Sequence, residues 1–265
     1  MKKSRTQIIA TIGPSSENEE MFSAMVESSM DVIRLNMSWS SIEDHQKHIN
    51  LIKKVSKKLK VYIPIIVDLP GPRVELGRGH TYISQKDFQI DKEDEEMIEF
   101  GIKNNVQYFA LSFVASGDDV LKYAKKVEDL KGDQKLIAKI ERKLAVENFD
   151  GILEKADAIM IARGDLGKEV PIEQVPFIQS EIIHKAKSKG KPVIVATEML
   201  YSMVQNPEPT RAEVTDVSMA VMEGADALML SDETAIGKYP DLAVCVMDKV
   251  ILESEKHEDT KLNIL

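Results

Sequence analysis

The stretch KLIAKIERKLAVENFDGILEKADAIMIARGD, residues 135–165, contains two apolar runs with an amphipathic segment between them. The runs Lys135–Glu141 and Ala158–Asp165 contain the consecutive apolar residues LIA and AIMIA, so each is typical of a strand that is buried on both faces. The segment Ala145–Lys155 between them carries apolar residues at helical spacing. A buried strand, a helix and a second buried strand are the repeating unit of a parallel sheet covered by helices.

The same pattern recurs along the whole chain. Further strand-like runs are Ile8–Gly13, Val32–Asn36, Val61–Asp68, Tyr108–Val114, Pro192–Thr197 and Ala227–Ser231. Further helical segments are Ser41–Leu59, Glu93–Asn104, Asp118–Leu130, Glu173–Lys189, Ala212–Glu223 and Asp241–Glu255. Eight such units in about 250 residues are the expected content of a (β/α)₈ barrel. We therefore predict the α/β class and a single TIM barrel over residues 1–265, with a doubly wound open sheet as the alternative.

Composition excludes several classes of function. The chain has 265 residues, 43% of them hydrophobic, which is enough to bury a large core. Its net charge of −9 argues against nucleic-acid and anionic-membrane partners, although a local cationic pocket could still bind a small anion. The N-terminal apolar stretch is too short for a signal peptide and runs into Gly13 and Pro14. We expect a cytoplasmic protein with a small-molecule ligand.

Barrel enzymes place their active sites at the C-terminal ends of the strands, and these ends are rich in polar residues here. A chance pattern would show turn formers with an occasional charge. The strand-end residues are Arg34, Asn36, Ser38, Asp68, Ser112, Lys139, Glu141, Arg163, Asp165, Thr197, Glu198, Ser231 and Glu233. The sequence therefore predicts one polar, charged rim.

Two carboxylates on neighbouring strands suggest a metal site within this rim. Lys139 and Glu141 are two apart on an extended segment and should point the same way, and we expect the same of Arg163 and Asp165. Glu141 and Asp165 offer hard oxygen ligands for Mg²⁺ or Mn²⁺. Lys139 beside that metal is unfavourable unless an anionic substrate lies between them.

The two residues before Asp165 are Arg163 and Gly164, and the sequence suggests a different role for each. Gly164 lets backbone N–H groups approach a substrate carboxylate, as a helix N-terminus does. The alternative for each charged residue taken singly is a rim ion pair, and we favour that explanation for Arg163.

Several long motifs resemble one known family. They are IIATIGPSS, VIRLNMSWSS, VDLPGPRVELG, LIAKIERKLAVENFDGILEKADAIMIARGDLGKEVP and PVIVATEMLYSMVQNPEPTRAEVTDVSMAVMEGADALMLSDETAIGKYP. Together they closely resemble the catalytic barrel of pyruvate kinases, from Thr6 to about Lys256. The resemblance implies that Glu141 and Asp165 bind Mg²⁺ or Mn²⁺ and that Lys139 stabilises enolate and phosphoryl charge.

The resemblance also assigns roles to other rim residues. It implies that Arg34 grips phosphate, that Thr197 lies near the methyl group of pyruvate, and that Ser231 is linked through water to protonation of the enolate. The catalytic residues are thus Lys139, Arg34, Thr197 and Ser231. The substrate-binding set is Ala162, Arg163, Gly164, Asp165, Thr197 and Ser112.

The chain also departs from the family pattern in its domains. In the family a lid domain interrupts the barrel after the third strand, whereas here we expect only a short connector at about residues 77–91. A C-terminal regulatory domain should follow the last helix, but the chain ends at Leu265, so we expect this domain to be absent too. Lid closure excludes water from phosphoryl transfer, so its loss weakens the case for a kinase.

Smaller departures fall at the nucleotide and monovalent-cation sites. The family's DTKGPEIRTG reads DLPGPRVELG, which places Arg73 and Glu75 where the family has the opposite charges. Together with apolar Leu69 and Leu76, Arg73 resembles the potassium-independent branch, so we expect no K⁺. The side chain of Arg73 would replace K⁺ near Asn36, Ser38 and Asp68. Glu75 would repel a phosphate unless Arg73 neutralises it.

Three further substitutions remain open. Trp39 stands at the histidine of the family's NFSHG and either stacks on a base or packs against the shortened connector. Glu198 and Asp232 add acid near the mouth, either as a general acid or base or as solvated carboxylates.

The leading functional hypothesis is a metal-dependent lyase that acts on pyruvate or a related 2-oxo acid through a metal-bound enolate, by an aldolase or decarboxylase reaction. The alternative is a minimal potassium-independent pyruvate kinase that transfers phosphoryl from phosphoenolpyruvate to ADP. The third is a non-catalytic, metabolite-binding paralogue. Any homo-oligomer would form through the barrel helices.

Overall fold

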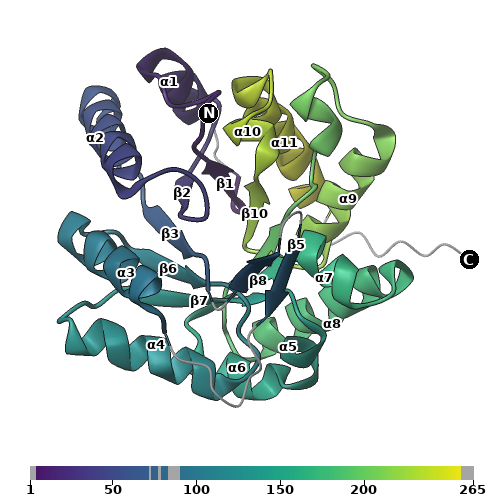
Figure 1. Ribbon diagram of the computed structural model, residues 1–265. Helices are drawn as coiled ribbons and strands as arrows, with labels where there is room; N and C mark the ends of the chain where they lie inside the picture. The colour runs from purple at the N-terminus through teal and green to yellow at the C-terminus, as the bar shows by residue number, and fades with distance from the viewer. Residues whose placement is uncertain (1–3, 72, 77–78, 83–89, 258–265) are drawn as a thin grey trace, which may run out of the picture.

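The computed structural model describes residues 4–71, 73–76, 79–82 and 90–257, with residues 73–76 and 79–82 described by their backbone alone. Eight parallel strands close into a barrel in the order β1-β10-β9-β8-β7-β6-β3-β2, and helices surround it (Figure 1). The predicted α/β class and TIM barrel are confirmed.

Each predicted strand run overlaps one barrel strand. The strands are β1 (Gln7–Thr11), β2 (Val32–Asn36), β3 (Ile65–Leu69), β6 (Tyr108–Leu111), β7 (Lys135–Ile140), β8 (Ala158–Ala162), β9 (Val193–Ala196) and β10 (Ala227–Leu230). The largest differences lie at three boundaries: β3 begins at Ile65 rather than Val61, β6 ends at Leu111 rather than Val114, and β8 ends at Ala162 rather than Asp165.

The long predicted helices are present, and three short ones were missed. The helices are α1 (Glu19–Glu27), α2 (Ile42–Leu59), α3 (Lys92–Asn104), α4 (Gly117–Asp129), α5 (Lys143–Glu147), α6 (Phe149–Lys155), α7 (Arg163–Glu169), α8 (Val175–Ser188), α9 (Arg211–Met222), α10 (Asp232–Ala235) and α11 (Pro240–Glu255). The predictions omitted α1, α7 and α10, which are too short for a clear apolar periodicity. The predicted Ala145–Lys155 helix is divided at Asn148, whose side chain donates to the carbonyl of Ala115 at 2.9 Å.

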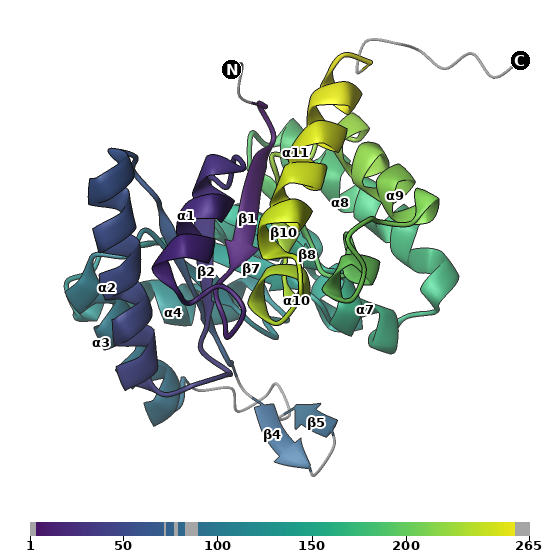
Figure 2. The ribbon, with the colours of Figure 1, turned by 90° about the horizontal axis from the view of Figure 1, so that it is seen from above.

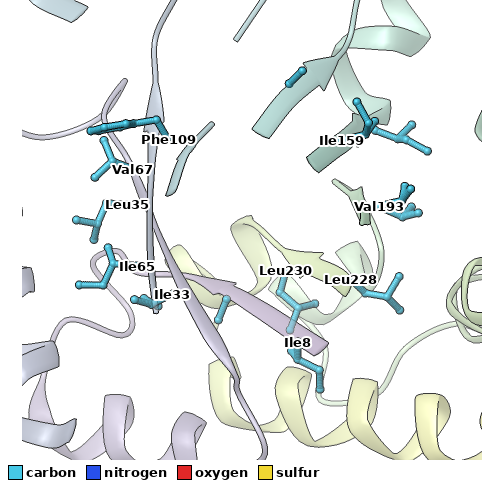
Figure 3. Close-up of a cluster of buried hydrophobic side chains, with 14 of the residues drawn as sticks. Ile8, Ile33, Leu35, Ile65, Val67, Phe109, Ile159, Val193, Leu228 and Leu230 are labelled. Carbon is cyan, nitrogen blue, oxygen red and sulfur yellow. The ribbon is translucent and has the colours of Figure 1, made fainter. Parts of the chain in front are cut away.

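Alternation along the strands divides the apolar side chains into two clusters. Ile9, Val32 and Ile66 belong to a cluster shared by all eight barrel strands, which fills the interior. Their neighbours Ile8 and Ile33 belong to the larger cluster that also contains the helix residues. Figure 3 shows members of this outer cluster on several strands. Each fully buried Ile or Leu contributes about 1.5–3 kcal/mol, so these two layers supply most of the driving force for closure.

A small hairpin interrupts the third β/α unit. The strands β4 (Arg73–Leu76) and β5 (Gly79–Tyr82) pair antiparallel, whereas β3 pairs directly with β6 in the barrel wall. Figure 2 shows the hairpin standing clear of the barrel, on the side toward which β1 points. The predicted connector at 77–91 therefore contains one of these strands, while its residues 77–78 and 83–89 lie outside the described residues.

A buried polar contact anchors the chain where it leaves the barrel for this hairpin. Gly71 has φ +70°, and a Cβ atom there would lie 2.5 Å from the carbonyl oxygen of Ser112, so only glycine fits. Its N–H donates to Asp94 of α3 at 3.3 Å, and the hydroxyl of Tyr123 of α4 donates to the same carboxyl group. Burial raises the pKa of Asp94 to about 6.

Among the helices that the structure describes, none has the length and apolar content needed to cross a membrane.

Candidate active site

Asp68 near the end of β3 joins charged residues from two other strands. Its Oδ2 accepts from Nε of Arg34 at 2.6 Å, and its Oδ1 accepts from Nζ of Lys139 at 3.0 Å and from Oγ of Ser112 at 3.2 Å. Only 2% of Asp68 is exposed. Burial alone would raise the pKa of Asp68, but the Arg34 and Lys139 charges outweigh it and lower the pKa. The carboxylate is therefore ionised and holds both cations in place.

Lys139 of β7 faces Glu141, as their spacing in the sequence predicts. Its Nζ donates to Oγ of Ser112 at 2.7 Å and lies 3.6 Å from Oε2 of Glu141. Burial alone would lower the pKa of Lys139, but the charges of Asp68 and Glu141 outweigh it and raise the pKa. The ammonium group is thus charged, buried and fixed in direction.

Glu141, which follows β7, has one satisfied and one unsatisfied oxygen. Its Oε1 accepts the N–H of Phe113 at 2.6 Å, and Phe113 has φ +59°, a conformation that is costly for a residue other than glycine. Its Oε2 is buried and has no hydrogen-bond partner. Burial, opposed by the Lys139 charge and assisted by the nearby Asp165 carboxylate, raises the pKa of Glu141 to about 7.

These two carboxylates fit a hard divalent cation. A buried carboxylate oxygen without a hydrogen-bond donor is costly, and the Lys139 ammonium 3.6 Å away is shared with Asp68, so a further cation beside Glu141 and Asp165 is favourable. The described residues contain no group of three or more His, Cys, Asp or Glu side chains placed to bind a metal. Mg²⁺ commonly binds through one or two carboxylates and takes its other ligands from water and substrate, so the pair suffices.

Asp165 lies in the first turn of α7, where it is also within reach of an unpredicted lysine. Nζ of Lys168 lies 2.8 Å from Oδ1 of Asp165, and 74% of the lysine side chain is exposed. The signal in the sequence was the spacing of three residues between an acid and a lysine, which meet on a helix. We missed it because we treated Asp165 as the end of a strand.

The prediction that Arg163 and Asp165 point the same way is wrong. Both residues belong to α7, where side chains two apart diverge, rather than to an extended segment. Arg163 instead donates to Oδ1 of Asp216 on α9 at 2.7 Å and to the carbonyl of Thr197 at 3.0 Å. The favoured explanation of Arg163 as part of an ion pair is thus confirmed, and its partner lies on another helix.

Thr197 lies beside Gly164, just after β9. The N–H of Gly164 donates to Oγ1 of Thr197 at 2.8 Å, so the backbone group expected to meet a substrate carboxylate is engaged here by a hydroxyl. Ala162, the last residue of β8, is buried directly before this contact.

Two polar residues follow β10 with different surroundings. The Oγ of Ser231 is buried without a hydrogen-bond partner. Glu233 is fully buried and accepts the N–H groups of Ser231 at 2.8 Å and Leu200 at 3.0 Å, so it braces the backbone. Burial raises the pKa of Glu233. Asp232 and Glu198 are both exposed.

The chain forms a tight turn at the C-terminal end of β2, just before the exposed Trp39. Oδ1 of Asn36 accepts the N–H of Ser38 at 3.2 Å, and Nε2 of His45 lies 2.7 Å from the carbonyl oxygen of Trp39. Trp39 is 74% exposed, and most of the connector lies outside the described residues, so both alternatives for Trp39 stay predictions. The side chains of Arg73 and Glu75 lie outside the described residues, so their expected roles stay predictions.

A sequence profile described as "Pyruvate kinase, barrel domain" matches residues 3–95 and 85–244. The chain belongs to the pyruvate kinase family. It is 36% identical to a pyruvate kinase from Thermococcus litoralis over 336 residues, covering 97% of this chain and 71% of that protein. It is 34% identical to a pyruvate kinase from Staphylococcus aureus over 339 residues, covering 97% of this chain and 58% of that protein.

Two further features of these matches concern the length of the relatives and the middle of this chain. The alignments to the two pyruvate kinases run over 336 and 339 residues, more than the 265 residues of this chain, so those relatives carry residues that this chain lacks. The two parts of the family match overlap at residues 85–95, next to the β4–β5 hairpin.

The pyruvate kinase family thus accounts for the motifs in the sequence, and the geometry adds contacts that motif reasoning missed. These are the shared role of Asp68, the brace from Arg163 to Asp216, and the Lys168 contact to Asp165. Each joins residues whose proximity depends on a closed barrel or on a helix that was not predicted.

Proposed function

We propose that this protein transfers a phosphoryl group between phosphoenolpyruvate and ADP, with Mg²⁺ or Mn²⁺ held by Glu141 and Asp165. The observation that carries the proposal is the buried Oε2 of Glu141, which has no hydrogen-bond partner and lies 3.6 Å from the Lys139 ammonium. A cation on the carboxylates and a fixed ammonium beside them suit a substrate that develops negative charge on a carbonyl oxygen. Membership of the pyruvate kinase family supports phosphoenolpyruvate as that substrate.

Residues around Lys139 prepare the site for this charge. The Asp68 carboxylate and the Ser112 hydroxyl orient the ammonium, so it is ready to stabilise the enolate oxygen when phosphorus leaves. Arg34, held by the same carboxylate, supplies a second cation for the phosphoryl group. When bound, the divalent metal polarises the substrate oxygens as a Lewis acid.

The opposite side of the mouth suits proton delivery to carbon. The Thr197 hydroxyl is fixed by Gly164, and the Ser231 hydroxyl is buried without a partner, so it is available to a water molecule or to the substrate. In the pyruvate-forming direction the enolate carbon must receive a proton, and hydroxyl groups that order a water can deliver it.

This proposal reverses the order of the hypotheses drawn from the sequence. The lyase hypothesis, in which a 2-oxo acid is cleaved or extended through its enolate, becomes the second candidate because the relatives are named pyruvate kinases. One observation still favours it: β3 ends at Leu69 and α3 begins at Lys92, so few residues lie between them, and the relatives align over more residues than this chain has. We propose that the connector at about 77–91 replaces the lid within a single barrel domain.

Several expectations stay predictions alongside this proposal. They are independence from K⁺ through Arg73, a cytoplasmic location, small-molecule partners without nucleic acid or membrane, and a homo-oligomer formed through barrel helices.

Two reactions test the proposal and separate its candidates. Purified protein is mixed with Mg²⁺ or Mn²⁺, phosphoenolpyruvate and ADP, and pyruvate is followed with lactate dehydrogenase. Independently, exchange of the pyruvate methyl protons in D₂O is followed by NMR without nucleotide. We expect both activities. Exchange without phosphoryl transfer would favour the lyase, and neither activity would refute both enzymatic candidates.

Matched variants locate the chemistry. Lys139→Ala and Glu141→Gln should each abolish both activities. The control is Lys135→Ala, because Lys135 is a lysine at the opposite end of the same strand, paired there with Asp157 at 3.1 Å. Lys135→Ala should keep wild-type rates. Loss of activity in the control, or its survival in Lys139→Ala, would place the site elsewhere.

A further inference from the structure

The segment after β9 holds two successive residues in a costly backbone conformation. Thr197 has φ +73° and Glu198 has φ +54°, although neither is glycine. A β-branched residue such as threonine rarely adopts a positive φ, because its Cβ crowds the following peptide. Such a conformation persists only where surrounding contacts hold it, and it clusters at functional sites.

Three hydrogen bonds hold Thr197 in this conformation: its hydroxyl donates to the Ala196 carbonyl at 2.6 Å, and the other two come from the start of α7. The N–H of Gly164 donates to Oγ1 of Thr197 at 2.8 Å, and Nη2 of Arg163 donates to the Thr197 carbonyl at 3.0 Å. A return of φ to a negative value would turn the carbonyl and the side chain of Thr197 away from these donors. The guanidinium group therefore opposes the relaxation of the strained residue.

Arg163 is itself held in place by residues from two helices. Its Nη1 donates to Oδ1 of Asp216 on α9 at 2.7 Å and to Oε1 of Gln179 on α8 at 3.3 Å. The Arg163 side chain is only 13% exposed, whereas that of Asp216 is 35% exposed. Charge-assisted contacts of this kind fix the direction of a guanidinium fork. The conformation of Thr197 thus depends on the position of Arg163, and the position of Arg163 depends on Asp216.

We propose that Asp216 is a positioning residue for the reaction: by orienting Arg163 it holds Thr197 in its strained conformation, with the hydroxyl at the Gly164 end of the substrate site. Asp216 touches neither Thr197 nor Gly164 in the contacts above and acts only through the guanidinium group. The inference rests on the proposed function insofar as it places the substrate beside Thr197.

A double-mutant cycle tests whether Asp216 acts through Thr197. The proteins are wild type, Asp216→Asn, Thr197→Ala and the double variant. We expect Asp216→Asn to lower kcat about tenfold, the scale of a sub-ångström misplacement. In the Thr197→Ala background the same change should have less than a twofold effect, because there is no hydroxyl left to position. Equal effects in both backgrounds would refute the proposal, and so would a wild-type kcat in Asp216→Asn.

Further measurements separate positioning from simple destabilisation. A purely structural role would lower the Tm by the same amount in both backgrounds without the difference in kcat. Asp216→Glu keeps the charge and should recover most of the lost kcat, and it replaces Asp216→Asn in the cycle if that variant does not fold. Glu181→Gln, on the exposed face of α8, is the charge-matched control and should match wild type.

A readout without turnover keeps the test independent of the proposed function. Binding of oxalate in the presence of Mn²⁺ is measured by calorimetry for the same four proteins. We expect Asp216→Asn to weaken oxalate binding about threefold in the wild-type background and not in Thr197→Ala. A wild type that lacks both enzymatic activities would refute the proposed function, whereas additive oxalate affinities would refute the role of Asp216 alone.

Discussion

The buried carboxyl group of Asp94 should make the stability of this barrel depend on pH in a predictable direction. Burial raises its pKa from 3.8 to about 6, with Asp91 and Glu93 adding to the rise and the Tyr123 hydrogen bond opposing it. Because the folded-state pKa is raised, the folded protein favours the protonated carboxyl group. The contribution of Asp94 to stability is therefore greatest below pH 3.8 and is lost as the pH rises through about 6.

The magnitude follows from the shift. A difference of about 2 pKa units corresponds to about 3 kcal/mol once the pH is well above 6. About 2 kcal/mol of this stability should be lost between pH 4.5 and pH 7.5. The remaining amount, roughly 1 kcal/mol, is already lost below pH 4.5, because the carboxyl group of the unfolded chain ionises around pH 3.8. Asp94→Asn is neutral at every pH, and its amide can accept from Gly71 and donate to the Tyr123 oxygen.

The assay is urea unfolding of wild type and Asp94→Asn at pH 4.5, 5.5, 6.5 and 7.5. The free energy of unfolding of wild type minus that of the variant should fall by about 2 kcal/mol over this range and then level off. All other titrating groups are common to both proteins and cancel in the difference. A difference that is constant, or that grows with pH, would refute the reasoning.

A second variant checks the cause of the shift. Tyr123→Phe removes a hydroxyl that donates to Asp94 and lowers its pKa. The pKa of Asp94 should therefore rise further, and the loss of stability should move to higher pH. A shift to lower pH would show that the hydroxyl does not stabilise the ionised carboxylate.

Two further predictions concern the metal site. At a Mn²⁺ concentration of 100 Kd, wild type should gain about 2.7 kcal/mol of stability, which is measured as a rise in Tm. Glu141→Gln should lose this gain, because the Oε2 atom that has no hydrogen-bond partner is gone. An undiminished gain would show that Glu141 is not a metal ligand. Lys168→Ala should bind Mn²⁺ up to about fivefold more tightly at low salt, because an exposed ion pair worth about 0.2–1 kcal/mol no longer competes for Asp165, and the advantage should shrink with added salt. Electron paramagnetic resonance of free Mn²⁺ measures this affinity, and an unchanged or weaker affinity would contradict the role of Lys168.

Much of the fold and part of the site could be predicted from neighbouring residues in the sequence. The apolar runs located every barrel strand, because a strand buried on both faces requires apolar residues at consecutive positions. The long amphipathic helices followed from apolar spacing in the same way. Lys139 and Glu141 were paired correctly, because residues two apart on an extended segment share a direction whatever surrounds them.

The boundary after β8 shows where local reasoning fails. We extended the predicted strand to Asp165, past the last apolar residue Ala162, yet pairing with β9 ends at Ala162 and α7 begins at Arg163. A strand ends where its neighbours stop pairing, and the neighbours are set by closure of the barrel. This error of three residues placed Arg163 beside Asp165 at the end of a strand, whereas in the structure its guanidinium group donates to Asp216.

The sequence by itself determined the barrel class, the identity of the polar rim and the acids available to a metal. Only the tertiary structure decided which charges meet: Asp68 with Lys139, 71 residues away, and Arg163 with Asp216, 53 residues away. Apolar periodicity is a property of neighbouring residues and can be read along the chain. Ion pairs and unsatisfied oxygens depend on distances between remote segments, which exist only after the eight strands have closed.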